Sequence, residues 1–517
     1  MFYFIPAWYS ENRSWRMETP YWYRVMNRLV FDDTTSQLKL FHDAGEKSRL
    51  ILLAYQPHLR YFLHKHDLLG INYWSFFDDI QNIHLESSIA IDFKELNWPE
   101  GASFTYSPFF VHVRVRGEIF AIVQFAENGN LHSIETYHLG VKEYQYFFDD
   151  RGFLSSYIVF QDGQAYYQNF LNLQGTWQVR EYLEPDNKSI LINPEADGSF
   201  LKTVYSDWEE LIEERLKQFK NEHFSREDCL VIAAHDQHDD LLGQLFSEHK
   251  KIYSLFEERF LSDFSLEAVS RYAQLLLVQN EEQFIRLKKV IGEGDGPAIS
   301  QISLFDTRLR LGKSQTVAEM RIYFVIDGIT IQELKDALER LWPLLAENKL
   351  LTLELVTYDA TCNMTSLEED LLAYIMTSQW ASELTMPVEE GENQLLEEER
   401  RAFRSVYFST MTDENQIIAA LDIARVVVDL SQTPHHYTQI ACLSAGLPQV
   451  NRVENPFVYH LQNGWIMTNE GELPEAIRYY TDGLSNWNKA LVKTVQMMAD
   501  YTSGRLIDQW KDMIKTL

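Results

Sequence analysis

Basic side chains and tight turns in the second half of the chain could bind a phosphorylated ligand. Arg308, Arg310 and Lys313 form a concentrated basic group that could hold the phosphates of a nucleotide, or could pair with the surrounding excess of acidic residues. Two turns follow, Ala-Gly-Leu-Pro at 445–448 and Gln-Asn-Gly at 462–464. Beside such turns, one carboxylate can accept hydrogen bonds from the vicinal hydroxyls of a ribose, and a second can hold a sugar. The chemistry therefore depends on whether two carboxylates are present.

The turns at Gly446 and at Asn463 and Gly464 resemble the sugar-nucleotide side of a GT-B glycosyltransferase. That family usually supplies both carboxylates as glutamates, the later one five positions before the glycine and the earlier one eight positions further back; here these positions hold Ala441 and Thr433. A methyl group and a neutral hydroxyl cannot replace the two acceptors. The resemblance therefore implies a transferase scaffold with a degenerate donor site, and we expect no catalytic residue and no cofactor.

The composition excludes several classes of function. The chain has 517 residues, which exceeds the length that a single hydrophobic core usually spans. Its 46 Lys and Arg against 76 Asp and Glu give a net charge of −30. Such a charge opposes binding to nucleic acid or anionic lipid. Cys229, Cys362 and Cys442 are too scattered for a disulfide framework or a zinc knuckle. No signal peptide and no apolar run of about 18 residues is apparent, so we expect a soluble, cytoplasmic protein.

A cluster of histidines and aspartates at residues 235–240 has residue types that bind metals. We interpret it as a polar loop at the end of a strand that leads into a helix cap, because no further ligand set is identifiable. We therefore expect no metal site.

Alternating apolar runs and helical patterns predict a doubly wound α/β fold in both halves. Residues 2–6 and 49–55 have the continuous apolar character of buried parallel strands, and a strand at 229–234 opens a second α/β region. We expect a GT-B-like protein with two Rossmann-like halves: residues 1–102 as the first part of the N-terminal half, 193–225 as a return helix and linker, 226–485 as the C-terminal half, and 486–517 as a helical segment that crosses back to the N-terminal half, as in the GT-B arrangement.

Residues 103–192 show a different period, with alternating apolar residues and a turn about every ten to twelve residues. This pattern predicts an inserted antiparallel β-meander. Its aromatic residues suit contact with an extended polypeptide or another partner, although any one of them could instead pack against the main body. The candidate substrate or partner surface consists of Tyr137, Tyr144, Tyr146, Tyr157, Tyr166 and Tyr167.

Four segments spread over nearly the whole chain resemble the first accessory secretion protein family, glycosyltransferase-like proteins of the bacterial accessory Sec pathway. They are MFYFIPAWY at the start with Trp15 close behind, DTRLRLGKSQ from residue 306, ACLSAGLPQV from 441 and HLQNGWIM from 460. The resemblance implies a cytoplasmic complex with two further accessory secretion proteins, which passes a serine-rich-repeat adhesin to the dedicated ATPase and channel of the pathway. It also implies a position at the inner face of the membrane.

The resemblance leaves two classes of function open. The first is a non-catalytic component that binds the adhesin and the sister proteins. The alternative is an active or residual glycosyltransferase, or a lectin-like protein that binds the glycans of the adhesin. By analogy with a related O-GlcNAc transferase of the pathway, the meander is where we expect the substrate or a partner to make contact.

Overall fold

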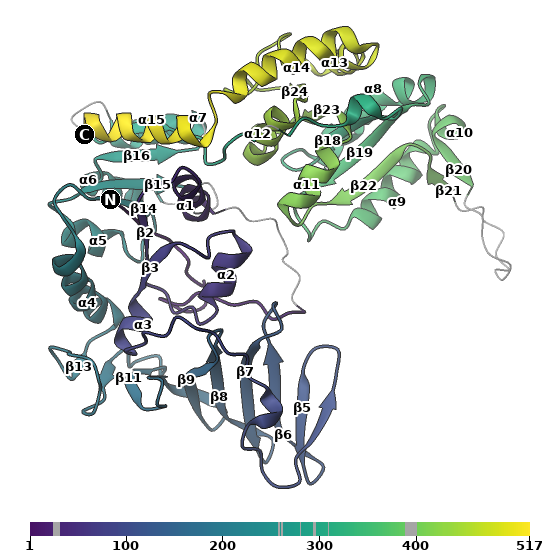
Figure 1. The fold of residues 1–517 in the computed structure, drawn as a ribbon. Helices are drawn as coiled ribbons and strands as arrows, with labels where there is room; N and C mark the ends of the chain where they lie inside the picture. Colours follow the sequence, from purple (N-terminus) through teal and green to yellow (C-terminus); the bar gives the residue numbers. More distant parts are fainter. Residues whose placement is uncertain are drawn as a thin grey trace. The chain divides into compact units, whose positions relative to one another are not determined.

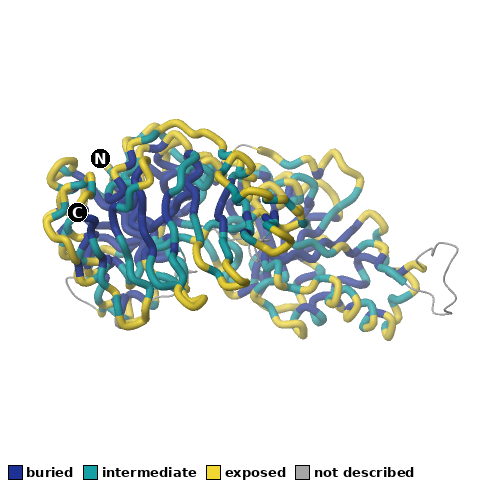
Figure 2. The backbone as a smooth tube through the Cα atoms, turned by 90° about the horizontal axis from the view of Figure 1, so that it is seen from below, coloured by how far each residue is buried: buried dark blue, intermediate teal, exposed yellow. Residues whose placement is uncertain are grey.

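The chain divides into two compact units (Figure 1). The first contains residues 32–304 together with the first residues of the chain and 511–517, and the second contains residues 305–510. Buried residues concentrate inside each unit (Figure 2). The computed structural model describes residues 1–23, 32–256, 259, 262–279, 281–292, 296–308, 310–387 and 401–517.

The first unit is built on a seven-stranded parallel sheet with the order β17-β16-β15-β14-β1-β2-β3. Its central strands are almost entirely buried, which explains their continuous apolar sequences. The strands are β1 (Phe2–Ile5), β2 (Ser48–Leu52), β3 (Asn72–Ser75), β14 (Cys229–Ala233), β15 (Lys250–Leu255), β16 (Leu275–Val278) and β17 (Ala298–Gln301). The helices are α1 (Asp33–Asp43), α2 (Leu59–Lys65), α3 (Phe76–Ile80), α4 (Trp208–His223), α5 (Asp239–Leu245), α6 (Asp263–Tyr272) and α7 (Glu281–Ile291).

The structure differs from the expected boundary of the C-terminal half. Strand β14 pairs in parallel with β1, with Phe2 opposite Cys229, so β14–β17 extend the first sheet instead of opening the second half at residue 226. The physical reason is that a buried parallel strand has the same apolar character in either sheet. Its sequence therefore identifies a strand but not its pairing partner.

A ten-stranded antiparallel sheet is inserted into this unit, and its strands pair in sequence order. The predicted meander is confirmed, and the sheet continues past residue 192 to Tyr205. The 3₁₀ turn η1 (Phe93–Glu95) precedes it. Its strands are β4 (Ser103–Tyr106), β5 (Val111–Val115), β6 (Glu118–Phe125), β7 (Leu131–His138), β8 (Val141–Asp149), β9 (Phe153–Gln161), β10 (Gln164–Leu171), β11 (Trp177–Tyr182), β12 (Ile190–Ile192) and β13 (Val204–Tyr205).

The second unit contains a six-stranded parallel sheet with the order β22-β19-β18-β23-β24-β25. Its strands are β18 (Met320–Val325), β19 (Leu351–Thr357), β22 (Val406–Thr410), β23 (Ala424–Asp429), β24 (Gln449–Asn451) and β25 (Gly464–Ile466), and a separate two-stranded sheet joins β20 (Thr385–Pro387) and β21 (Arg401–Phe403). The helices are α8 (Ile331–Glu347), α9 (Met364–Ile375), α10 (Ala381–Leu384), α11 (Glu414–Leu421), α12 (His436–Ala445), α13 (Leu473–Thr481) and α14 (Leu484–Met498), with short 3₁₀ turns η2 (Ser314–Thr316) and η3 (Glu470–Glu472).

The last helix, α15 (Ser503–Thr516), links the two units covalently. It belongs to the second unit as far as Trp510 and to the first from Lys511 onward. Within the first unit, Lys511 forms an ion pair with Glu46, and Lys250 donates a hydrogen bond of 2.9 Å to the carbonyl of Ile514. The expected crossing of the C-terminal helix back to the N-terminal half is therefore confirmed.

Candidate functional site

Ligands of doubly wound folds bind at the carboxyl ends of the parallel strands. In the second unit, Asp327 follows β18, Tyr358 follows β19 and Asp429 ends β23. The hydrogen bonds of these side chains decide whether the edge is available to a nucleotide.

Both oxygens of the Asp429 carboxylate accept hydrogen bonds from the loop that follows it. One of its oxygens accepts from the backbone and hydroxyl of Ser431 at 3.0 and 2.6 Å, and the other accepts from the backbone N–H of His435 at 2.8 Å. Burial raises the pKa of Asp429, and these hydrogen bonds oppose the shift. The carboxylate therefore holds the turn that starts α12.

A chain of hydrogen bonds fills the space beside Asp429. The Tyr358 hydroxyl lies 3.1 Å from that of Tyr323 and 2.5 Å from that of Thr438, and Thr438 lies 2.8 Å from Nδ1 of His435. The His435 ring also stacks on Tyr358, with 4.0 Å between centroids. Burial raises the pKa of Tyr358, which stays neutral. The polar groups at this edge are satisfied by one another.

Asp327 has the same role on the neighbouring loop. Its carboxylate accepts from the Thr357 hydroxyl at 2.6 Å and from the backbone N–H of Tyr358 at 2.7 Å. The positions expected to carry donor-binding glutamates lie nearby: Thr433 in the half-buried loop before α12, and Ala441 within α12, where it packs against the hydrophobic core. Neither side chain is an anionic acceptor.

The structure places the backbone of the predicted basic group along α12 and toward its C-terminal end. The backbone N–H of Arg308 donates to the Ser444 hydroxyl at 3.2 Å, and that of Gly312 donates to the Ala445 carbonyl at 2.9 Å. The backbone N–H of Lys313 donates to the Asp422 carbonyl at 2.6 Å, just before β23 begins. These bonds fix the segment at the amino side of the sheet. The backbone of the basic group and the Asp429 carboxylate therefore lie at opposite ends of β23.

The charges of Arg308 and Arg310 nevertheless act on Tyr437, at the start of α12. Burial and the Glu414 carboxylate raise the pKa of Tyr437, and the two guanidinium groups oppose that shift. Arg310 pairs with Asp422 at 3.3 Å, and Arg308 lies 3.7 Å from Asp306. The basic group is thus exposed and partly neutralised by neighbouring acids, and the residue between the two arginines, at position 309, lies outside the described residues.

The glycines and the asparagine of the two turns have structural roles. Gly446 ends α12 with φ +76°, and an added Cβ would lie 2.3 Å from Cδ1 of Leu491. A Cβ on Gly464 would lie 2.3 Å from the carbonyl oxygen of Gln449 on the neighbouring strand. The buried Asn463 accepts from Tyr459 N–H and donates to the Phe457 carbonyl, both at 2.8 Å. The geometry of the turns accounts for all three residues.

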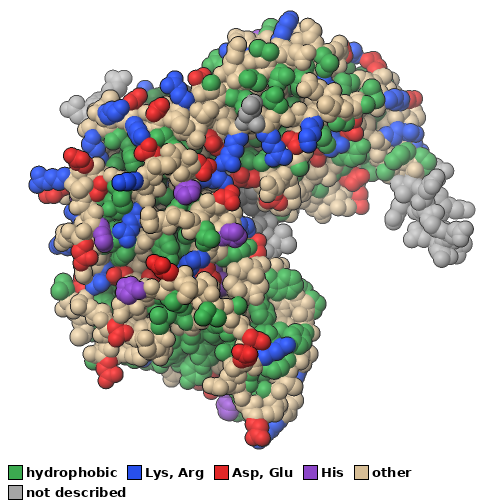
Figure 3. All heavy atoms as spheres, viewed as in Figure 1, with side chains coloured by type: hydrophobic (Ala, Val, Ile, Leu, Met, Phe, Trp, Pro, Cys, Tyr) green, Lys and Arg blue, Asp and Glu red, His purple; other side chains and the backbone are tan. Residues whose placement is uncertain are grey.

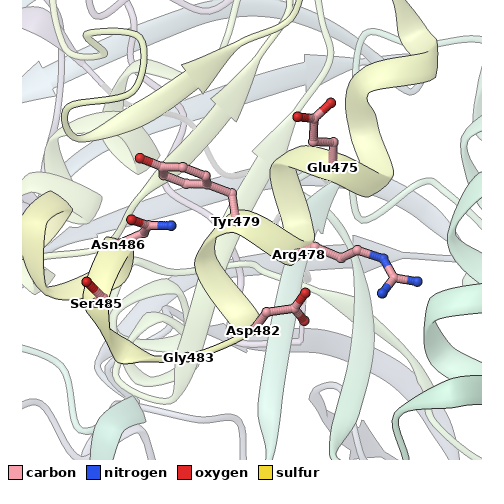
Figure 4. Close-up of a pocket in the computed structure, with 7 residues that line it drawn as sticks. All are labelled: Glu475, Arg478, Tyr479, Asp482, Gly483, Ser485 and Asn486. Carbon is pink, nitrogen blue, oxygen red and sulfur yellow. The ribbon is translucent and has the colours of Figure 1, made fainter.

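A surface hollow of about 300 Å³ lies where α13 meets α14 (Figure 4). It contains none of the residues predicted for the donor cleft, and its Arg478 pairs with Glu347 at 2.7 Å. Its lining residues are Glu475, Arg478, Tyr479, Asp482, Gly483, Ser485 and Asn486.

The ten-stranded sheet brings most of the predicted tyrosines together, and hydrophobic side chains gather over this part of the molecule (Figure 3). Tyr146 lies opposite Tyr157, and both Tyr144 and Tyr167 lie opposite Val159 on the strand between them. Because residues opposite one another in a sheet share a face, these four tyrosines form one surface. We call it the tyrosine face; its ring centroids are 5.8 Å apart for Tyr144 and Tyr146, 6.0 Å for Tyr146 and Tyr157, and 6.4 Å for Tyr144 and Tyr157.

Two residues on the tyrosine face were not predicted. Tyr182 lies opposite Tyr167, and the guanidinium carbon of Arg180 lies 4.0 Å from the centroid of the Tyr167 ring. Arg180 also donates to Asn169 at 2.8 Å, and Asn169 donates to the Tyr157 hydroxyl at 2.6 Å. The alternation of residues 177–182 was the sequence signal that could have identified both.

The other two predicted tyrosines lie beside this surface. Tyr166 sits at a bulge in β10, with its ring 5.2 Å from that of Tyr167. Tyr137 donates to the Glu135 carboxylate at 2.6 Å, and burial together with this carboxylate raises the pKa of Tyr137. Tyr137 therefore belongs to a separate polar contact near the β7–β8 turn.

The described residues contain neither a metal-binding cluster nor a membrane-spanning helix. No group of three or more His, Cys, Asp or Glu side chains among them is arranged to hold a metal ion. No helix within the same ranges has both the length and the apolar character needed to cross a membrane.

Comparison with known proteins identifies the family. The family model described as the first accessory Sec system protein matches residues 1–517. The chain belongs to this family. A member from Streptococcus gordonii is 34% identical over 525 residues, covering 100% of this chain and 99% of the relative. A member from Staphylococcus aureus is 27% identical, with coverage of 100% and 99%. The resemblance seen in the sequence is confirmed, and it places the chain in the accessory Sec system.

Solved structures of two relatives have the same fold. The glycosylation-associated protein complex Gap123 of Streptococcus agalactiae contains a chain that is 36% identical, with a TM-score of 0.79 and coverage of 98% of this chain and 99% of that one. The structure of accessory secretory proteins 1, 2 and 3 of Streptococcus pneumoniae contains a chain that is 32% identical, with a TM-score of 0.80 and complete coverage of both chains.

A more distant likeness establishes the GT-B-like fold. The pneumococcal O-GlcNAc transferase GtfA, solved with UDP and GlcNAc, has a TM-score of 0.67 at 12% identity, over 100% of this chain and 98% of that one. At this identity the likeness shows the fold alone. The expected GT-B-like architecture is confirmed.

Proposed function

We propose that this chain is a non-catalytic component of the accessory Sec export machinery. In complex with two other accessory secretion proteins, it binds the serine-rich-repeat adhesin and helps to deliver it to the dedicated ATPase and channel. It works in the cytoplasm, at the inner face of the membrane during delivery. Solved relatives that are named as complexes of three proteins support the assembly.

The proposed non-catalytic role rests on the internal hydrogen bonds at the carboxyl edge of the parallel sheet in the second unit. Asp327 and Asp429 each hold a loop, and the hydroxyls of Tyr358 and Thr438 bond to each other. A nucleotide would have to displace these internal bonds before it could form its own. Each displaced bond to a charged group costs about 1.5–3 kcal/mol, which opposes donor binding.

The tyrosine face is the surface that we propose for contact with the adhesin or a partner. It offers flat rings with hydroxyl groups at their tips, and Arg180 adds a positive charge beside the Tyr167 ring. Aromatic and arginine side chains are the residue types that contribute most to protein interfaces.

Calorimetric titration and co-purification together test the proposal. We expect no heat when the chain is titrated with UDP-GlcNAc, and a stable complex with the two other accessory secretion proteins that retains glycosylated adhesin on a size-exclusion column. Tight nucleotide binding, or no complex with any of these proteins, would contradict the proposal.

A residual glycosyltransferase is the second candidate, and the exposed Arg308, Arg310 and Lys313 favour it. A radiolabelled-donor assay with bare and glycosylated Ser/Thr-rich acceptor decides between the two. Incorporation of label that Arg308→Ala reduces would establish the transferase, whereas no incorporation by the wild-type chain would exclude it.

A further inference from the structure

Among the strands that the structure describes, β4 forms one outer edge of the ten-stranded sheet and has β5 as its single partner. Its sequence is Ser-Phe-Thr-Tyr, without a charged residue or a proline. Natural proteins usually protect such edges with charges, prolines or bulges, because an unpaired strand is a template for another chain. The edge of β4 has none of these protections within the strand itself.

The hydrogen-bond pattern of the β4–β5 hairpin fixes which backbone groups point outward. The N–H of Ser107 donates to the Phe110 carbonyl at 3.0 Å, so this pair is hydrogen-bonded. Hydrogen-bonded and non-hydrogen-bonded pairs alternate along an antiparallel ladder. Thr105 therefore bonds to β5, while the N–H and C=O groups of Phe104 and Tyr106 point away from it. No other described residue forms a backbone hydrogen bond with these groups.

The strand is held firmly from one face. Phe104 packs against Phe93 and Trp98, with ring centroids 5.6 and 6.0 Å apart. Trp98 is fixed in turn, because its indole N–H donates to the Phe93 carbonyl at 2.7 Å. The outward backbone groups are thus presented on a strand that is already ordered, which lowers the entropic cost of binding.

Exposed aromatic side chains surround the C-terminal end of β4. Tyr106 is 59% exposed, Phe109 is 51% exposed and Trp22 is 48% exposed. The indole N–H of Trp22 donates to the Phe109 carbonyl at 3.1 Å, which joins the start of the chain to the β4–β5 turn. A strand added at the edge would cover part of this aromatic surface.

Charge argues against a second copy of the chain as the occupant. Each copy carries a net charge of −30, so two copies repel each other. A segment without charge avoids this repulsion, and the β-branched side chain of Thr fits a pleated edge. We propose that β4 is a strand-addition site that takes an extended, uncharged Ser/Thr-rich segment of a different polypeptide. The inference rests on the proposed function, since the adhesin polypeptide supplies such a segment.

Variants at Tyr106 separate the backbone contact from the side-chain contact. Tyr106→Pro removes an outward N–H that makes no bond to β5, and Tyr106→Lys places a charge on the edge. Tyr106→Thr keeps the N–H and removes the ring, so it is the matched control. The probe is a serine-rich-repeat segment made without glycans, and binding to the full chain is measured by calorimetry and by hydrogen exchange of residues 103–107.

We expect the proline and lysine variants to bind the probe with about tenfold lower affinity than the wild-type chain. The affinity of the threonine variant should lie within about threefold of the wild-type value. In the wild-type complex, the amides of Phe104 and Tyr106 should exchange more slowly. Wild-type affinity in both the proline and lysine variants would overturn the strand-addition site and leave the proposed function intact. An equal loss in the threonine variant, or self-association that the proline variant abolishes, would also overturn it. Failure of the wild-type chain to bind the bare probe while retaining glycosylated adhesin rejects only the strand-addition site, whereas failure to bind either rejects the proposed function as well.

Discussion

The guanidinium of Arg60 on α2 lies 2.8 Å from the Asp149 carboxylate at the end of β8. It also pairs with the neighbouring Asp150, and Arg151 connects Asp149 to Asp78 of α3. Asp149 and Asp150 are almost completely buried. This ionic network joins the ten-stranded sheet to helices α2 and α3 of the first unit.

Replacement of Arg60 by methionine should therefore destabilise the first unit strongly. The change removes the guanidinium that pairs with the buried Asp150 and leaves Asp149 paired with Arg151, and breaking a buried pair in this way costs about 3–5 kcal/mol. The matched control is Lys65→Met, because Lys65 forms a solvent-exposed pair with Glu127 that is worth about 0–1 kcal/mol. Chemical denaturation measures both. Equal stability of the two variants would show that the network contributes no more than a surface pair.

His58, at the start of α2, should make stability depend on pH. Burial lowers the pKa of His58 to about 4, whereas an unfolded histidine has a pKa of about 6.5. Between these values the unfolded chain takes up a proton that the folded chain does not, so the contribution of His58 to stability should fall as the pH falls from about 6.5 to about 4. His58→Gln should reduce this dependence.

Urea denaturation across the same pH range measures the effect. His84→Gln, at an exposed histidine, is the control for the replacement of an imidazole by an amide. A His58 variant with the wild-type slope would show that its imidazole does not remain neutral in the fold.

Gly446→Ala should destabilise the second unit through backbone strain and a collision. The position has φ +76°, and the new Cβ would meet the Leu491 side chain at 2.3 Å. A non-glycine residue in this conformation costs about 1–3 kcal/mol before any collision. Gly45→Ala is the matched control, because Gly45 has φ +72° with no heavy atom within 4 Å of the new Cβ. Thermal unfolding should show the larger loss at Gly446, and equal losses would mean that Leu491 moves aside freely.

Local sequence patterns predicted where helices and strands form better than they predicted which strands pair with each other. The hairpins of the inserted sheet were predictable because alternation and turn residues act over a few positions. The pairing of β14 with β1 was not, since Phe2 and Cys229 lie far apart in the sequence and any buried parallel strand would fit. The absence of donor-binding carboxylates at positions 433 and 441 could be read directly from the sequence, which has Thr433 and Ala441 there. The use of Asp327 and Asp429 as internal acceptors could not, because it depends on loop geometry.

The tyrosine face provides the most direct test of contact with the adhesin or a partner. Tyr144 is 37% exposed, and it lies on the same surface as Tyr157 and Tyr167. Truncation of a central aromatic residue in an interface typically costs about 1–2 kcal/mol or more, so Tyr144→Ala should weaken binding of glycosylated adhesin at least about fivefold. Tyr407→Ala, at an exposed tyrosine on β22 of the second unit, is the control and should bind as the wild-type chain does.

Binding of the variants can be compared by surface plasmon resonance with the adhesin immobilised. Because Tyr144 is partly exposed and its ring contacts among the described residues are with Tyr146 and Tyr157 of the same face, its truncation should change the melting temperature little. Loss of affinity without loss of stability would support direct contact at this surface. Unchanged affinity of Tyr144→Ala together with Tyr167→Ala would move the adhesin contact away from the tyrosine face, and it would leave the β4 edge as the remaining site on the sheet.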